Sequence, residues 1–255
     1  MTLQLLLSLV SGIFIAAAAA YLGTLMLSRK MAVIADPLGH LALPGAALAL
    51  IYGFSLALGA FPFVILGIVL IWLLEQHTPL QTEALTAIVF AAGVGITFLF
   101  LPISRAEEAL IGDISRVSRG ETLLAVVLGA GVILLVRQSY ARIMLLSIHE
   151  DLAKAEGIHV ARYNFIYLLA IAVVVALGVN LVGGLMTSAL VAIPAAAARN
   201  IGRRLAQYES VAIGFGVAAA VIGILLSAYT RLPAGPLVIL ASTALFTATL
   251  AFARA

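Results

Sequence analysis

Long apolar stretches separated by short charged segments dominate this chain. Stretches of about 15–25 mostly apolar residues have the length of a membrane-spanning helix. Phe61–Leu74 is short for a full crossing, and the tight turn at Leu181–Gly184 separates two stretches that can form one broken pair. The pattern predicts an all-α integral membrane protein, a polytopic bundle of nine transmembrane helices with eight as the alternative, forming one domain over residues 1–255. The nine stretches are Leu3–Leu27, Ala35–Leu58, Phe61–Leu74, Ala84–Leu101, Thr122–Val136, Phe165–Asn180, Leu185–Ala198, Val211–Ala228 and Pro236–Ala253.

Composition excludes a soluble protein. Apolar residues make up 64% of the chain and charged residues 10%, with a mean hydropathy of +1.21. A soluble domain carries roughly 25% charged residues, so this chain has too few polar side chains to cover a globule. The net charge of +3 is small and its basic residues are scattered at the ends of apolar stretches, which does not indicate a nucleic-acid partner. The chain has no cysteine, which excludes disulfides and thiolate metal sites.

The basic residues predict the orientation of the chain in the membrane. With the N-terminus outside and nine alternating spans, ten Lys and Arg residues lie in the inside segments and four lie outside. This distribution follows the positive-inside rule and places the C-terminus inside. The inside residues are Arg29, Lys30, Arg137, Arg142, Lys154, Arg162, Arg199, Arg203, Arg204 and Arg254, and the outside residues are Arg105, Arg116, Arg119 and Arg231.

Two ionisable residues lie in the second stretch. Asp36 and His40 are the only residues with acidic, basic or imidazole side chains between Met31 and Leu74. An ionisable group inside a membrane costs several kcal/mol unless it has a partner or a function. On a helix, positions i and i+4 share one face, so this pair can hold a divalent cation, a proton or each other. A structural alternative is a helix start, because Asp-Pro suits the N-cap and first helical positions.

The longest charged segment, Arg137–Tyr163, contains a predicted short helix around SIHEDLAKAEGI. Ser147 and Glu150 have the spacing of a capping box, and Gly157 is suited to end the helix. Ile148 and Leu152 fall on one face of this helix. An ordinary surface link between two spans and a docking site for a cytoplasmic partner both fit this pattern.

Sequence motifs limit the chemistry that the chain performs. Neither of its two lysines, Lys30 and Lys154, lies in the G-x-x-x-x-G-K-[ST] context of a nucleotide-binding P-loop. The H-E-x-x-H motif of zinc proteases is also missing, which argues against an intramembrane enzyme. If the protein pumps, its energy therefore comes from another subunit or from an ion gradient.

Three segments together resemble the permease subunits of bacterial zinc/manganese/iron ABC importers. AVIADPLGHLALPGAA at Ala32–Ala47 is similar to the family's Asp, three residues, His, then Leu-Pro-Gly. Ile148–Gly157 is similar to the family's coupling helix, with its Leu-Ala-x-x-x-Gly core. VGGLMTSALVAIPAAAAR at Val182–Arg199 is similar to a third family segment, and LIGDISRVS at Leu110–Ser118 also fits. The three segments occur in the family's order.

The resemblance implies a multi-pass subunit of the bacterial inner membrane, with no permanently bound cofactor, that carries a divalent zinc, manganese or iron ion. Two copies would line one path, with Asp36 and His40 of each copy as metal ligands. A cytoplasmic ATP-binding subunit would dock on the coupling helix, and an extracytoplasmic metal-binding protein would deliver the ion, with the loop Pro102–Glu121 as its contact. The docking residues would be Ile148, His149, Asp151, Leu152, Ala153 and Gly157, and the residues expected to pack or kink the spans are Pro44, Gly45, Gly183, Gly184 and Pro194.

Two positions depart from the family pattern. Gly39 stands where the family usually has Ser, and His149 stands where the coupling helix usually opens with Asp. Neither departure removes an expected metal ligand. The competing function is an ion- or proton-coupled secondary transporter that would use Asp36 and His40 as its coupling groups.

Overall fold

A computed structural model of the protein describes residues 3–29, 31, 35–100, 114 and 117–252. Every regular element in this part of the chain is a helix, which confirms the predicted all-α class. The elements are α1 (Leu3–Ser28), α2 (Ala35–Leu41), α3 (Leu43–Tyr52), α4 (Leu56–His77), α5 (Thr82–Phe100), α7 (Arg119–Ile148), α8 (Glu150–Ala155), α9 (Val160–Val182), the 3-10 turn η3 (Gly184–Met186), α10 (Thr187–Ile201), α11 (Leu205–Thr230), α12 (Ala234–Thr249) and the 3-10 turn η4 (Leu250–Phe252).

Six of these helices are long and apolar enough to cross a membrane: α1, α4, α5, α7, α9 and α11. The remaining apolar helices are shorter, with 15 residues in α10 and 16 in α12. At 1.5 Å per residue, these two are about 23–24 Å long, below the roughly 30 Å of a hydrocarbon core. The count of nine spans therefore stays a prediction, although each of the nine stretches contains helix.

The second apolar stretch is not one helix. Its residues form two short helices, α2 and α3, and α3 ends at Gly53 with a φ of 74°. Pro44 lies in the first turn of α3, where the missing N–H of proline costs no hydrogen bond. Apolar residues continue through the break, so hydropathy alone predicts one helix where the structure has two.

The third stretch is longer than expected. Its helix α4 runs from Leu56 to His77 and contains Pro62 in its interior. At 22 residues it is about 33 Å long, which is enough for a full crossing. The predicted bounds Phe61–Leu74 were too short, because the flanking Leu56–Ala60 and Glu75–His77 also adopt helix.

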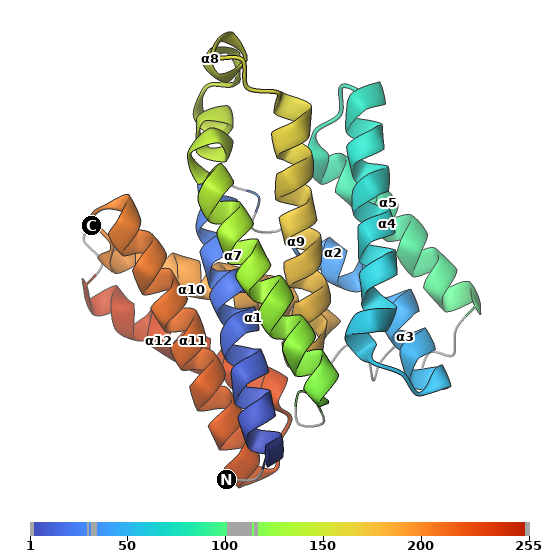
Figure 1. Ribbon diagram of the computed structural model, residues 1–255, viewed down its shortest axis with the longest axis vertical. Helices are drawn as coiled ribbons and strands as arrows, with labels where there is room; N and C mark the ends of the chain where they lie inside the picture. Colours follow the sequence, from blue (N-terminus) through green and yellow to red (C-terminus); the bar gives the residue numbers. More distant parts are fainter. Residues whose placement is uncertain (1–2, 30, 32–34, 101–113, 115–116, 253–255) are drawn as a thin grey trace.

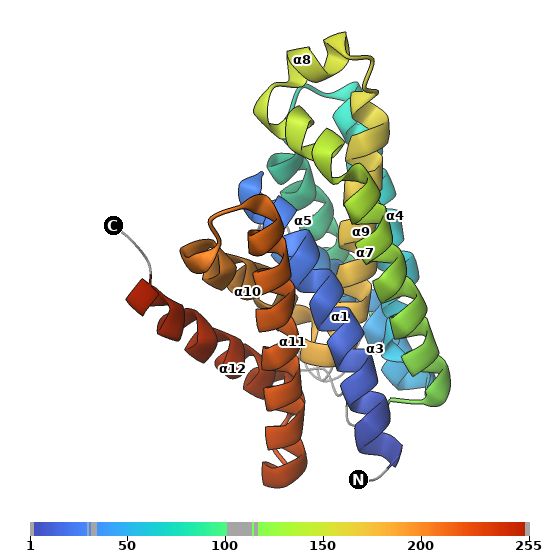
Figure 2. The ribbon, with the colours of Figure 1, turned by 60° about the vertical axis from the view of Figure 1, so that its left-hand side comes forward.

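The helices form three groups (Figure 1). α1, α7 and α9 lie in the middle, α2–α5 on one flank, and α10–α12 on the other. Figure 2 shows α10–α12 on the opposite side of α1 from α7 and α9. α9 is the most buried of the six long helices, followed by α1. α9 and α1 contribute more side chains to the core than the other helices do, including Leu22, Leu25, Tyr167 and Ile171. α9 is therefore the central helix of the bundle.

The N-terminus and α8 lie at opposite ends of the molecule (Figure 1). α7 has 30 residues and is about 45 Å long, so it exceeds a hydrocarbon core by about 15 Å. It opens with a capping box in which the Ser118 hydroxyl accepts from the Glu121 N–H and the Glu121 carboxylate accepts from the Ser118 N–H. The excess length at the other end carries α8 away from the body of the bundle.

At the α8 end, α1 and α9 are tied together by polar groups. The Arg29 guanidinium donates a hydrogen bond to Asn164 Oδ1 at 3.2 Å and lies 4.6 Å from the centre of the Tyr167 ring. Trp72 of α4 donates to the carbonyl of Ala161 near the start of α9. The first turns of α9 are therefore fixed to two neighbouring helices.

Candidate functional site

Asp36 and His40 both lie on α2, one helical turn apart, and both are half-buried. This helix has seven residues and packs among α4, α5, α9, η3 and α10. Residues at i and i+4 on a helix face the same way, so the carboxylate and the imidazole share one side of α2. Three residues in the same helix, Leu38, Leu41 and Gly39, are buried. The pair therefore lies inside the bundle on an otherwise apolar element.

The Asp36 carboxylate has a partner from a distant part of the chain. Ser188, the second residue of α10, donates a hydrogen bond from its hydroxyl to Asp36 Oδ1 at 3.1 Å. α2 begins at Ala35, before Asp36, and the hydrogen bond joins residues 152 positions apart. Asp36 therefore links α2 to α10 through this hydrogen bond, and it also lies in the first turn of α2.

The His40 imidazole lies against an aromatic ring. The centre of the Phe90 ring of α5 is 5.5 Å from the centre of the imidazole, with the two planes tilted by 51°. This distance lies within the range of favourable aromatic pairs, which limits rotation of the imidazole. α5 thus holds one member of the pair and α10 holds the other.

The approach of α2 to η3 is unusually close and depends on two glycines. A Cβ added to Gly39 would lie 2.5 Å from the carbonyl oxygen of Gly184, and a Cβ added to Gly184 would lie 3.0 Å from that of Gly39. Gly183, which ends α9, has a φ of 82° that favours glycine. The turn after α9 therefore packs backbone to backbone against the helix that carries Asp36 and His40.

Asp36 and His40 are the candidate metal ligands that this region of the chain offers. Among the described residues, no group of three or more His, Cys, Asp or Glu side chains is placed to hold a metal ion. Zn²⁺ usually takes four ligands, and carboxylate and imidazole groups suit both zinc and manganese. Asp36 and His40 are two side chains of the type that these metals accept, which is fewer than the four ligands that zinc usually takes.

The segment from Ile148 to Gly157 projects from the end of the molecule (Figure 1). Ile148 is 64% exposed and Leu152 is 49% exposed, while His149 and Asp151 are also exposed. Ala153 is completely buried, and α8 contacts its neighbours α7 and α9. Ile148 is the last residue of α7 and Leu152 lies in α8, so the exposed apolar side chains of this segment come from two helices and not, as predicted, from one face of a single helix.

The start of α8 differs from the prediction. Ser147 is the next-to-last residue of α7, and its hydroxyl donates to the carbonyl of Ile143 within that helix. His149, without a side-chain capping bond, precedes α8, so the predicted Ser147–Glu150 capping box was wrong. The predicted end is correct: Gly157 has a φ of 77° just past the helix, where a residue with a side chain would be strained.

The residues expected to pack or kink the spans occupy the following places. Gly45 of α3 faces Gly59 of α4 so closely that an added Cβ would lie 1.9 Å from the Gly59 carbonyl oxygen. Pro194 lies in the interior of α10. Such small residues let helices approach each other in lipid, where apolar burial gives little attraction between helices.

A family comparison decides the class of the protein. The model of the ABC-3 family, described as the ABC 3 transport family, matches residues 2–253. The chain belongs to this family. The match confirms the resemblance drawn from the three sequence segments.

Several curated proteins that are similar to this chain have names that refer to manganese or zinc. The manganese import system permease protein ScaB of Streptococcus gordonii is 23% identical over 94% of this chain and 87% of its own length. The high-affinity zinc uptake system membrane protein ZnuB of Haemophilus influenzae is 28% identical over 94% of each chain.

A solved structure shares the fold of this ABC-3 chain. PsaBC from Streptococcus pneumoniae, in complex with Fab, superposes with a TM-score of 0.82 at 23% identity, over 98% of this chain and 92% of that one. At this identity, the similarity establishes the fold.

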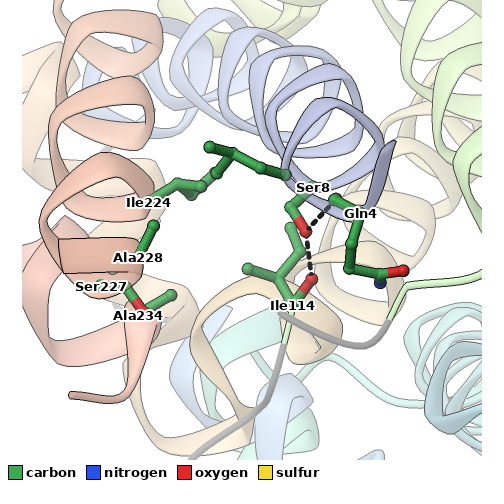
Figure 3. A pocket seen from close by; sticks show the side chains of 8 residues that line it. Gln4, Ser8, Ile114, Ile224, Ser227, Ala228 and Ala234 are labelled. Carbon is green, nitrogen blue, oxygen red and sulfur yellow. Dashed lines mark hydrogen bonds between the residues drawn. The ribbon is translucent and has the colours of Figure 1, made fainter. Parts of the chain in front are cut away.

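At the N-terminal end, a pocket of about 160 Å³ lies between α1, α11 and the residue Ile114 (Figure 3). The Ser8 hydroxyl donates to the carbonyl of Ile114 at 2.8 Å, and the Gln4 side chain donates to the carbonyl of Val117 at 2.9 Å.

Most of the loop Pro102–Glu121, expected to contact a delivery protein, lies outside the described residues. Its role stays a prediction.

Sequence reasoning found Asp36 and His40 but missed Ser188 and Phe90. Ser188 had a signal, because it is one of two adjacent hydroxyl residues, Thr187 and Ser188, in the otherwise apolar stretch that follows the Val-Gly-Gly turn. Phe90 had none, because an aromatic residue in an apolar span is ordinary.

Proposed function

We propose that this chain is the permease subunit of an ATP-driven importer of manganese or zinc. The observation that carries the proposal is the Asp36–His40 pair on α2, inside a member of the ABC-3 family. Relatives in that family are named for manganese import and zinc uptake, and both ions accept a carboxylate and an imidazole. Iron, which the resemblance also includes, has no such support from these relatives.

Two copies of the chain would complete the metal site. One copy supplies two ligands, and a second copy related by a two-fold axis would supply another Asp36 and His40, giving four. The apolar surroundings make the carboxylates costly when the site is empty and favour a cation that neutralises them. Such a site admits the ion and still releases it, as passage through a membrane requires.

Energy for transport would come from a separate ATP-binding subunit. The exposed Ile148 and Leu152 on the projecting segment would form the apolar part of its docking site, since exposed apolar patches of this kind suit a protein partner. α9 begins three residues after Gly157 and ends at the turn that contacts Gly39, so it joins the docking segment to the site. ATP-driven movement of the partner would open the site alternately to each side. An extracytoplasmic metal-binding protein would deliver the ion from outside.

The test of the proposal is Asp36→Asn, which removes the charge but keeps the size of the side chain. Cells that rely on this permease are compared for uptake of Mn²⁺ and Zn²⁺. We expect uptake to fall to background while the variant still reaches the membrane and still co-purifies with its ATPase subunit. The matched control is Glu83→Gln, because Glu83 is exposed in the first turn of α5, and it should transport normally.

Two results would contradict the proposal. If the Asp36→Asn protein fails to accumulate in the membrane, this result would favour a structural role of Asp36 at the start of α2. Metal uptake by a chain that never binds an ATPase subunit, and that follows an ion gradient instead, would favour the secondary transporter with Asp36 as its coupling carboxylate.

A further inference from the structure

Ser188 is the polar group that α10 brings to the candidate metal site. The Ser188 hydroxyl donates a hydrogen bond to Asp36 Oδ1 at 3.1 Å, and the side chains of Ser188 and Asp36 are both half-buried. A carboxylate can rotate about its last bond, and a hydrogen bond from a fixed donor restricts that rotation. Ser188 therefore limits the directions in which the other carboxylate oxygen can face.

The position of Ser188 is itself fixed by its neighbours. The preceding residue, Thr187, is completely buried, and its hydroxyl donates to the carbonyl of Gly183 at 2.7 Å. A Cβ added to Gly178 of α9 would lie 2.8 Å from the Thr187 methyl group, so α9 and the start of α10 are in tight contact. Together with the Gly39–Gly184 contact, these interactions leave Ser188 little freedom relative to α2.

We propose that Ser188 is a positioning residue that orients the Asp36 carboxylate and thereby sets the affinity of the site for its transported cation. The inference rests on the proposed function, because it assumes that Asp36 binds the ion. Groups that hydrogen-bond to a ligating carboxylate hold it in the geometry that the metal needs, and their loss typically lowers metal affinity 10–100-fold. Ser188 acts through Asp36 and is not itself a ligand.

The experiment measures metal binding directly. The permease is purified with its ATPase subunit, reconstituted in lipid nanodiscs and titrated with Mn²⁺ alone and with Zn²⁺ alone by calorimetry. We expect Ser188→Ala to raise the Kd about 10–100-fold. Ser188→Thr keeps the hydroxyl on Cβ and should stay within about threefold of the wild-type Kd. The rate of ATP hydrolysis by the same complexes should be unchanged, because the hydroxyl acts on Asp36 and not on the partner.

The matched control is Ser210→Ala on α11, whose hydroxyl is exposed and donates to the carbonyl of Gln207 three residues away. It loses one serine hydroxyl and should bind both ions like the wild type. Equal losses of affinity in Ser188→Ala and Ser188→Thr, with lower ATP hydrolysis in both, would show a packing role and overturn the inference.

Asp36→Asn in the same titration separates this inference from the proposed function. If Asp36→Asn loses binding and Ser188→Ala binds like the wild type, then the inference on Ser188 is wrong and the proposed function stands. If Asp36→Asn binds as well as the wild type, or the wild type binds neither ion, then the proposed function fails and the inference fails with it.

Discussion

Gly39 has a structural role beside the two candidate ligands. A Cβ at this position would lie 2.5 Å from a backbone oxygen, so Gly39→Ala requires α2 or η3 to move. Overpacking of this kind typically costs about 1–3 kcal/mol. We expect Gly39→Ala to melt at a lower temperature in detergent and to bind Mn²⁺ more weakly, because the movement separates Asp36 from Ser188. The measurements are thermal unfolding and the titration described above.

Gly131→Ala on α7 is the control for this prediction. A Cβ at Gly131 meets nothing within 4 Å, and alanine is a better helix former than glycine. This variant should melt at the same or a higher temperature and bind the ion normally. A Gly39→Ala protein that behaves like Gly131→Ala would mean that the α2–η3 contact is more compliant than its geometry implies.

The sequence predicted the two candidate ligands but not the residues that hold them. Asp36 and His40 stand out because nothing else in the surrounding 44 residues, from Met31 to Leu74, carries an ionisable acidic, basic or imidazole side chain. Ser188 is 152 positions from Asp36, and the two meet because α10 packs against α2 in the folded chain. Periodicity within one helix carries no information on which distant helix lies beside it.

Among the elements, the projecting segment around α8 carries the clearest test of the proposed partner. Leu152→Asp places a charge in the exposed apolar pair of Ile148 and Leu152. Because an uncompensated charge in an apolar interface is costly, we expect the ATPase subunit to be lost on purification in mild detergent. ATP hydrolysis associated with the membrane should fall with it.

Leu80→Asp provides the matched control for the α8 prediction. Leu80 is also 49% exposed, lies between α4 and α5, and is predicted to be on the same side of the membrane as α8. It should leave the ATPase subunit bound. Loss of the partner in both variants, or in neither, would contradict docking at α8.

The elements show where hydropathy succeeds and where it fails. Each of the six long helices overlaps one of the predicted apolar stretches, although Phe61–Leu74 and Thr122–Val136 fall short of the full lengths of α4 and α7. Hydropathy missed the break between α2 and α3, because apolar residues continue through it. The Ser-x-x-Glu motif predicted a capping box at Ser147, whereas the structure has one at Ser118 and Glu121. Both Ser-x-x-Glu sequences fit the motif, and only the observed helix ends distinguish them.

At the scale of the whole molecule, the central question is how many times the chain crosses the membrane. With nine crossings, α8 and the C-terminal end lie inside, while the end of α11 lies outside. α12 is one of the short helices on which the count of nine depends, since it is about 24 Å long and follows closely after α11. The distribution of ten basic residues inside and four outside was obtained with nine crossings.

The chain contains no cysteine, so single cysteines can report its orientation without background labelling. We expect a membrane-impermeant maleimide to label Tyr229→Cys in intact cells, because Tyr229 is 89% exposed at the end of α11. Asp151→Cys in α8 and a cysteine appended after Ala255 should react only after the membrane is permeabilised. Labelling of the appended cysteine in intact cells would show that α12 does not cross, and it would reduce the count to eight. Labelling of Asp151→Cys in intact cells would show that the chain has the opposite orientation in the membrane. The docking segment would then lie outside, away from ATP, and an ATPase subunit could not bind at α8.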